Sequence, residues 1–124
     1  MIRTVEAELL GVRERFPDAS LVTADDGSTR LELPVVTLPA GWSQAATGVS
    51  VLVPPGYPTN RPDCFFADAS LRLASGQDPA SSGIQPLDGA PRRWFSWHLE
   101  SWNPLVDDLS RFVRFVERRL RDPR

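Results

Sequence analysis

The sequence has very little of the residues that build disulfide frameworks and metal centres. It contains one cysteine, Cys64, and one histidine, His98, in 124 residues. One cysteine cannot form an internal disulfide, and one histidine without ligand-spaced carboxylates beside it does not complete the ligand set of a metal. The sequence therefore predicts neither a disulfide-stabilised secreted domain nor a metal centre, and we expect no cofactor.

Long hydrophobic runs and a strong excess of charge are also missing. No segment approaches the roughly 18–20 consecutive apolar residues of a membrane span. Acidic residues stand near the N-terminus, where a signal peptide would need an apolar core. The net charge of −2 gives no electrostatic basis for nucleic-acid binding, and no glycine-rich loop opens a helix to hold phosphate. We therefore expect a cytoplasmic protein that binds neither membranes nor nucleic acids.

What is present is the composition of an ordinary globular domain. Hydrophobic residues make up 41% of the chain and charged residues 24%, which is enough apolar material for a packed core. The length fits one domain over residues 1–124, and the sequence has no internal repeat.

The first half of the chain has the periodicity of one helix followed by strands. Apolar residues at helical spacing predict an amphipathic helix over residues 3–16, ended by Pro17. The pair Asp26-Gly27 between two alternating segments predicts a hairpin, because glycine adopts a positive φ without steric cost. The predicted strands cover residues 20–24, 29–36, 49–53 and 64–66.

The second half has a long segment without regular pattern and then a helix. Residues 67–93 are rich in glycine, proline and serine, and irregular connections of this length are usually functional or mobile. Asn103 suits the N-cap of the last helix and Pro104 its first position, with a buried stripe that begins at Leu105. The whole order predicts an α+β fold in which helices pack on a four-stranded antiparallel meander.

Residues 94–104 combine three of the four tryptophans with the only histidine. Such a cluster is either a dense local core behind the start of the helix or an aromatic wall around a site. The arginines of the last helix have two readings as well, a solvated helix face or a surface for a partner.

This order of elements, with the motifs inside it, resembles the ubiquitin-conjugating enzyme (UBC) fold. Residues 53–66, VPPGYPTNRPDCFF, resemble the third strand, the tyrosine–proline turn and the fourth strand of that family. Trp102-Asn103-Pro104 resembles the tryptophan-x-proline that opens the helix after the active site. The segments 38–42, LPAGW, and 95–98, FSWH, resemble motifs of a bacterial branch, prokaryotic family E of this superfamily.

The chain departs from the eukaryotic relatives at the residues that carry out catalysis. No cysteine lies in the segment before the tryptophan-x-proline, and no His-Pro-Asn lies between residues 67 and 83. By the resemblance, Cys64 occupies an inward-facing position of the fourth strand, and a buried thiol has a raised pKa. The familiar thioester mechanism is therefore not supported.

Ser96 and His98 offer a different nucleophile and base. Positions i and i+2 lie on one face of an extended segment, so the imidazole could take the proton of the hydroxyl and allow an oxyester to form. Asp88 and Glu100 are both candidates to orient the imidazole, and the spacing does not select between them. The alternative is a structural histidine that hydrogen-bonds a backbone carbonyl.

The resemblance implies a carrier that accepts a ubiquitin-like modifier from an adenylating enzyme and transfers it to a target. In that reading Trp94 and Trp97 keep water from the ester, and the N-terminal helix binds the adenylating enzyme. A metallopeptidase encoded nearby is a further expected partner. The other hypothesis is an inactive UBC-like module that binds a ubiquitin-like protein or its activating enzyme without forming a bond. The expected binding residues are Arg3, Arg13, Arg15, Tyr57, Trp94 and Trp97, and the expected catalytic residues are Ser96 and His98.

Overall fold

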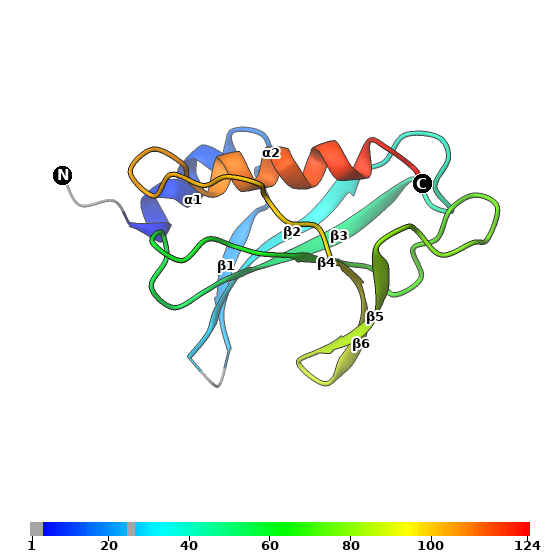
Figure 1. The fold of residues 1–124 in the computed structure, drawn as a ribbon, viewed down its shortest axis with the longest axis horizontal. Helices are drawn as coiled ribbons and strands as arrows, with labels where there is room; N and C mark the ends of the chain where they lie inside the picture. Colours follow the sequence, from blue (N-terminus) through cyan, green and yellow to red (C-terminus); the bar gives the residue numbers. More distant parts are fainter. Residues whose placement is uncertain (1–3, 25–26) are drawn as a thin grey trace.

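Two helices cover one face of a six-stranded antiparallel sheet (Figure 1). The computed structural model describes residues 4–24 and 27–124, and these counts refer to those ranges. The elements are α1 (Val5–Arg13), β1 (Ser20–Thr23), β2 (Thr29–Thr37), β3 (Ala46–Val53), β4 (Phe65–Ala67), β5 (Ser82–Leu87), β6 (Ala90–Phe95) and α2 (Leu109–Leu120). The strand order is β1-β2-β3-β4-β6-β5, and every neighbouring pair is antiparallel.

The predicted α+β class is confirmed, but the predicted four-stranded meander is two strands short. The segment 67–93, expected to be irregular, contains β5 and most of β6, joined by Asp88-Gly89. Both turn residues have positive φ, 52° and 78°, which is the backbone that a two-residue hairpin loop requires. Pro86 of β5 is paired with Pro91 of β6. Proline has no backbone N–H, so it fits in a strand only at a position that donates no hydrogen bond to the neighbouring strand. Asp88-Gly89 is an Asp-Gly pair like Asp26-Gly27 and could have predicted this hairpin. The prolines on both sides of it argued against strands.

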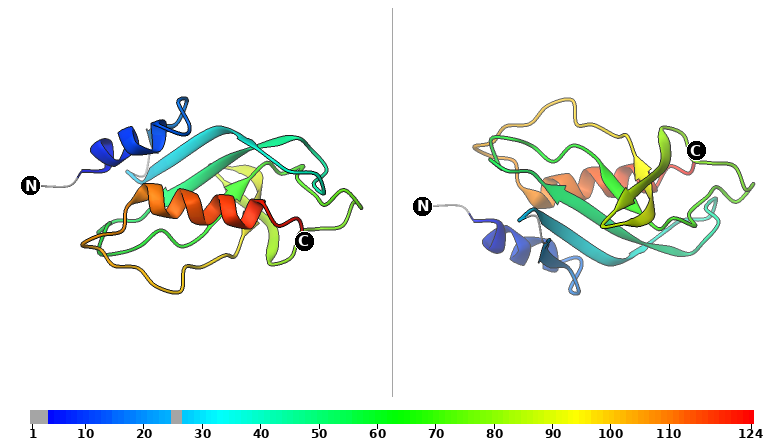
Figure 2. Two further views of the ribbon diagram at one scale, coloured as in Figure 1. Left: turned by 90° about the horizontal axis from the view of Figure 1, so that it is seen from above. Right: turned by 90° about the horizontal axis from the view of Figure 1, so that it is seen from below.

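The core lies between the sheet and α2, which crosses the middle of the sheet (Figure 2). Buried residues of α2 recur at helical spacing and meet the inward-facing residues of the central strands. α1 lies to one side, over the β1 edge, and contributes Leu9 and Val12. The α2 residues in the core are Leu109, Phe112, Val113, Val116 and Leu120.

α1 is shorter than the predicted helix over residues 3–16. Thr4 is the N-cap and accepts a hydrogen bond from the backbone N–H of Ala7, while the helix ends at Arg13, well before Pro17. Residue 3 lies outside the described residues. Glu8, which is buried, accepts a hydrogen bond from the backbone N–H of Leu109 at 2.8 Å, so α1 is tied to the first residue of α2.

The predicted start of the last helix is wrong by several residues. Asn103 closes a separate turn, in which its carbonyl accepts from the N–H groups of Val106 and Asp107. Leu105, expected to open the buried stripe, is 89% exposed. α2 begins after Asp108, whose carboxylate accepts from the backbone N–H of Arg111 at 3.0 Å. Asp108 satisfies a helix N-terminus more strongly than the amide of Asn103 does, because its charge also favours the helix dipole.

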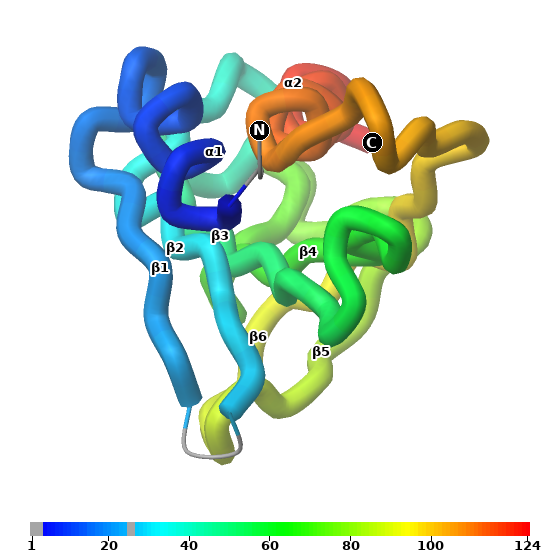
Figure 3. The backbone as a smooth tube through the Cα atoms, turned by 90° about the vertical axis from the view of Figure 1, so that its left-hand side faces the viewer, coloured from blue at the N-terminus to red at the C-terminus, as the bar shows by residue number. Residues whose placement is uncertain are grey.

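The sheet is strongly curved on the side away from the helices. The β1–β2 strands and the β5–β6 hairpin both extend to that side (Figure 3). Arg30 of β2 forms an ion pair with Asp88 at the β5–β6 turn, although β3 and β4 lie between their strands in the sheet.

We predict that Asp108→Ala lowers the free energy of unfolding by about 1 kcal/mol, because the first turn of α2 loses its N-cap. Urea denaturation measures the change, with Leu105→Ala as the control. That residue is exposed, so its substitution should shift the free energy by no more than about 0.5 kcal/mol. A larger loss from Asn103→Ala than from Asp108→Ala would place the start of the helix at Asn103 instead.

Candidate functional site

The pairing of β4 with β6 brings together two segments that are distant in the sequence. Phe65 is the register partner of Phe95, and their rings stack with centroids 4.8 Å apart. Both rings are fully buried. Asp63 lies two residues before Phe65, and Ser96 follows Phe95 directly. The residues just outside this pair are therefore held side by side at one end of the ladder.

Three side chains in these segments form a hydrogen-bonded chain. Ser96 Oγ lies 3.1 Å from His98 Nε2. His98 Nδ1 lies 2.6 Å from Asp63 Oδ1 and 3.1 Å from the backbone oxygen of Asp63. A serine, a histidine and an aspartate in this order have the connectivity of a nucleophile, its base and the group that orients the base.

The contacts of Asp63 determine which imidazole nitrogen carries hydrogen. Both of its oxygens near Nδ1, the carboxylate oxygen and the carbonyl oxygen, are acceptors, so Nδ1 must donate. In the neutral ring this leaves the lone pair on Nε2, which accepts from the Ser96 hydroxyl. That tautomer is the one that a general base for Ser96 requires.

The backbone around Ser96 is held on both sides. Its N–H donates to the carbonyl of Ser81 at 2.8 Å, and Ser81 has a left-handed backbone with φ 57°. After His98 the chain is anchored by Leu99, which is buried. Ser96 thus sits at the end of a strand rather than on a free loop, which keeps its distance to the imidazole defined.

The site is open to solvent and to a partner. The side chains of His98 and Asp63 are 48% and 66% exposed, and Ser96 is half-buried. A reacting group can therefore reach the hydroxyl without a movement of the fold.

Sequence reasoning missed Asp63 as the partner of His98. Of the two proposed orienting residues, Asp88 instead forms an ion pair with Arg30, and Glu100 makes no hydrogen bond or ion pair within the described ranges. Asp63 is 35 residues from His98 in the sequence, and the pairing of β4 with β6 brings the two residues together in space. One feature of the sequence could have drawn attention to Asp63, namely its position directly before the strand predicted over residues 64–66.

The two tryptophans expected to form one wall lie on different faces. Phe95 points into the core under α2, so Trp94 and Ser96, its neighbours in the strand direction, face the other side of the sheet. Trp97 packs against the core instead, stacked on Phe115 with centroids 6.4 Å apart. Only Trp94 therefore shares the face of the serine.

Trp97 also rests on a buried guanidinium. Arg119 is 2% exposed, and its guanidinium carbon lies 5.4 Å from the centroid of the Trp97 ring. Burial lowers the pKa of Arg119 from its ordinary value, and the charge of Arg124 acts in the same direction. These contacts make Trp97 an anchor for the chain between Ser96 and Leu99.

The expected inward-facing position of Cys64 is wrong. Phe65 occupies the core face, so Cys64 lies on the opposite face and is only half-buried. Burial is nevertheless the largest cause that raises the pKa of its thiol, and the nearby charge of Asp63 raises it as well, against a hydrogen bond with Trp94. Little thiolate is present at neutral pH, so Cys64 is a poor nucleophile although it lies close to Ser96.

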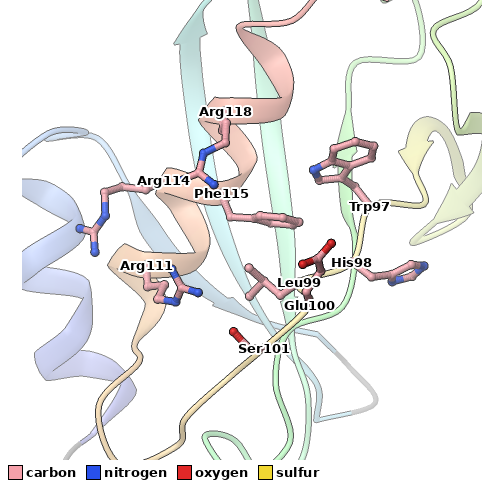
Figure 4. Close-up of a pocket in the computed structure, with 9 residues that line it drawn as sticks. All are labelled: Trp97, His98, Leu99, Glu100, Ser101, Arg111, Arg114, Phe115 and Arg118. Carbon is pink, nitrogen blue, oxygen red and sulfur yellow. The ribbon is translucent and has the colours of Figure 1, made fainter.

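A groove of about 570 Å³ lies between the segment that follows Ser96 and α2 (Figure 4). Residues 97–101 form one side, and Arg111, Arg114, Phe115 and Arg118 of α2 form the other. Figure 4 shows the side chain of His98 directed away from α2, so the imidazole stands on the outer side of this segment.

The remaining predicted binding residues are mostly engaged within the protein. Arg13 donates from Nε to the carbonyl of Ala19, and Arg15 forms an ion pair with Glu117 at 2.7 Å. The Tyr57 hydroxyl donates to the carboxylate of Glu8. Arg3 lies outside the described residues. All four residues stay a predicted partner surface. The side chains of Arg13, Arg15 and Tyr57 are already oriented by intramolecular contacts.

The part of the chain that the structure describes has neither a cluster of metal ligands nor a membrane-spanning helix. No group of three or more histidine, cysteine, aspartate or glutamate side chains there is arranged to hold a metal ion. Neither helix there is long and apolar enough to cross a membrane.

Comparison with known proteins identifies the family but no individual relative. No curated protein and no solved structure matches the chain. The family model described as prokaryotic E2 family E matches residues 19–122, which include β1 to α2 and all three residues of the Ser96–His98–Asp63 site. This protein therefore belongs to the prokaryotic E2 family E.

Proposed function

We propose that this protein is a carrier that holds the C-terminus of a ubiquitin-like modifier as an oxyester on Ser96. The observation that carries the proposal is the Ser96–His98–Asp63 chain of hydrogen bonds in a member of an E2-like family. Membership of the family supports a UBC-like carrier role, and the three side chains supply a nucleophile where no suitable cysteine is present. The partners in this proposal are a ubiquitin-like protein and an adenylating enzyme.

The geometry supports a two-step acyl transfer. In the first step Ser96 Oγ attacks the activated C-terminal carbonyl of the modifier, His98 Nε2 takes the hydroxyl proton, and the leaving group of the activated carbonyl departs. Asp63 stabilises the imidazolium that forms and keeps Nε2 directed at the serine. The imidazolium passes its proton to the departing group or to solvent before the second step. An amine of the target then attacks the ester and gives one proton to Nε2. The bond between the carbonyl carbon and Oγ breaks, and His98 returns the proton to the Ser96 oxygen.

The basic residues of the chain are compatible with this chemistry. All 14 are arginines, so the sequence contains no lysine. A guanidinium stays protonated and does not attack an ester at neutral pH, whereas the ε-amine of lysine can. An ester on Ser96 is therefore not consumed by a lysine side chain of the carrier itself.

We predict a covalent adduct when the protein is combined with ATP, a ubiquitin-like protein and the adenylating enzyme that activates it. The adduct should be cleaved by alkali and stable to thiol reductants, because it is an oxyester. It should disappear in Ser96→Ala and persist in Ser101→Ala, an exposed serine of the same segment. Denaturing electrophoresis and mass spectrometry of the adduct peptide make the measurement.

Persistence of the adduct in Ser96→Ala would place the acyl group on another residue. Binding of the modifier without any adduct would favour the alternative, an inactive binding module.

We further predict that Asp63→Asn slows formation of the adduct by about tenfold or more, since the neutral amide no longer stabilises the imidazolium or fixes its tautomer. The matched control is Glu100→Gln, which removes the carboxylate two residues after His98 and should leave the rate unchanged. Single-turnover loading of the carrier, followed by gel densitometry, gives both rates. Equal slowing in the two variants would show a general effect of charge and would contradict the assigned role of Asp63.

A further inference from the structure

We infer that the Ser96–His98–Asp63 site is also an esterase, which hydrolyses small activated esters with water and without any partner protein. The inference uses the same three residues as the proposed carrier function, but it needs neither a modifier nor an adenylating enzyme. It rests on three features of the site, namely the alignment of the three side chains, their access to water and the uncovered surface beside Trp94.

The alignment is already that of a hydrolytic site in the free protein. The Ser96 hydroxyl, 3.1 Å from Nε2, is within hydrogen-bond reach of its base, and the 2.6 Å contact to Asp63 fixes the tautomer. No partner is required to assemble these groups. A nucleophile paired with its base in this way attacks any sufficiently activated carbonyl that can approach it.

Water can reach both the serine and the imidazole. His98 has an exposure of 48%, and Trp97, which could have covered it, is turned toward α2 and Phe115. An acyl group on Ser96 is therefore open to attack by a water molecule activated by the same Nε2. A bulky modifier can exclude this water by covering the site, but a small acyl group cannot.

The edge strand beside Trp94 carries no side chain at Gly83. Gly83 of the edge strand β5 is the register partner of Trp94, and a Cβ atom built on Gly83 would meet no atom within 4 Å. The surface beside Trp94 is therefore uncovered at this position of β5, and an aryl group can contact the indole there. The backbone N–H of Trp97 donates to no acceptor within the described residues. In many serine hydrolases the N–H of the residue after the nucleophile stabilises the oxyanion.

Hydrolysis of p-nitrophenyl acetate takes place in two steps at Ser96. Ser96 Oγ forms a bond to the acetyl carbon, its proton passes to His98 Nε2, and the bond to p-nitrophenolate breaks. The imidazolium passes that proton to the departing p-nitrophenolate, which frees Nε2 to act as a base again. Water then attacks the acetyl-serine and gives one proton to Nε2. The bond between the acetyl carbon and Oγ breaks as the imidazolium returns the proton to Ser96 Oγ. Acetic acid leaves, so the net reaction is ester and water to acetic acid and p-nitrophenol.

The composition of the chain makes this activity measurable against a low background. The sequence has no lysine, one histidine and one cysteine, and the raised pKa of the Cys64 thiol leaves little thiolate at neutral pH. Cys64→Ala removes that remaining competitor, and its activity should equal that of the unmodified protein.

The test is p-nitrophenyl acetate hydrolysis by the purified full chain, followed as p-nitrophenolate absorbance, in a Cys64→Ala background. We expect Ser96→Ala and His98→Ala each to lower the rate by about tenfold or more, because the reaction loses its nucleophile or its positioned base. Ser101→Ala should have no effect. Mass spectrometry of rapidly quenched samples should find one acetyl group on the peptide that contains Ser96. Circular dichroism of each variant establishes that the fold is intact.

An undiminished rate in Ser96→Ala would show that the imidazole attacks directly and would overturn the inference. The inference would also be overturned if the unmodified protein hydrolysed the ester no faster than His98→Ala does. The outcome separates the two proposals. If the protein does not hydrolyse the ester but still forms a modifier adduct on Ser96, only the esterase inference is contradicted. If it hydrolyses the ester but forms no adduct, only the carrier proposal is contradicted.

Discussion

The stacked pair of Phe65 and Phe95 is the contact on which the site depends. Both rings are buried and face each other across two adjacent antiparallel strands, so β4 and β6 are fixed in one register. A shift by one residue would turn one ring out of the core and would cost the burial of a large aromatic side chain. The same register sets Asp63 beside the segment that carries Ser96 and His98. Core packing therefore determines the geometry of a polar site at the surface.

The site combines a rigid support with exposed reacting groups. The backbone N–H of Ser96 donates a hydrogen bond to the carbonyl of Ser81. The chain after Ser96 is held by Trp97 and Leu99, which pack in the core. The hydroxyl, the imidazole and the carboxylate project from this support toward solvent. A carrier protein needs such an arrangement, because its reacting group must be reached first by the protein that loads it and then by the target. The cost is that water reaches the same atoms.

The sequence was informative where local pattern and tertiary packing agree. The hairpin of β1 and β2, the third strand and the helical character of residues 109–120 follow from periodicity and turn residues. Helical spacing wrongly predicted that Leu105 belongs to the buried face of the last helix. It lies on a separate turn before the helix and is exposed. The pattern also failed for β5, whose prolines obscured a two-residue turn. The i, i+2 spacing of Ser96 and His98 predicts their proximity, but Asp63 depends on a strand pairing that no local pattern shows.

The central claim is that Asp63 holds His98 in the tautomer that makes Nε2 a base for Ser96. Long-range ¹H–¹⁵N correlation spectra of the uniformly ¹⁵N-labelled protein test it directly, because the only histidine gives a single pair of ring nitrogen resonances. In the neutral ring we expect hydrogen on Nδ1 and none on Nε2, and we expect Asp63→Asn to lose this preference. A neutral imidazole with hydrogen on Nε2 in the unmodified protein would contradict it.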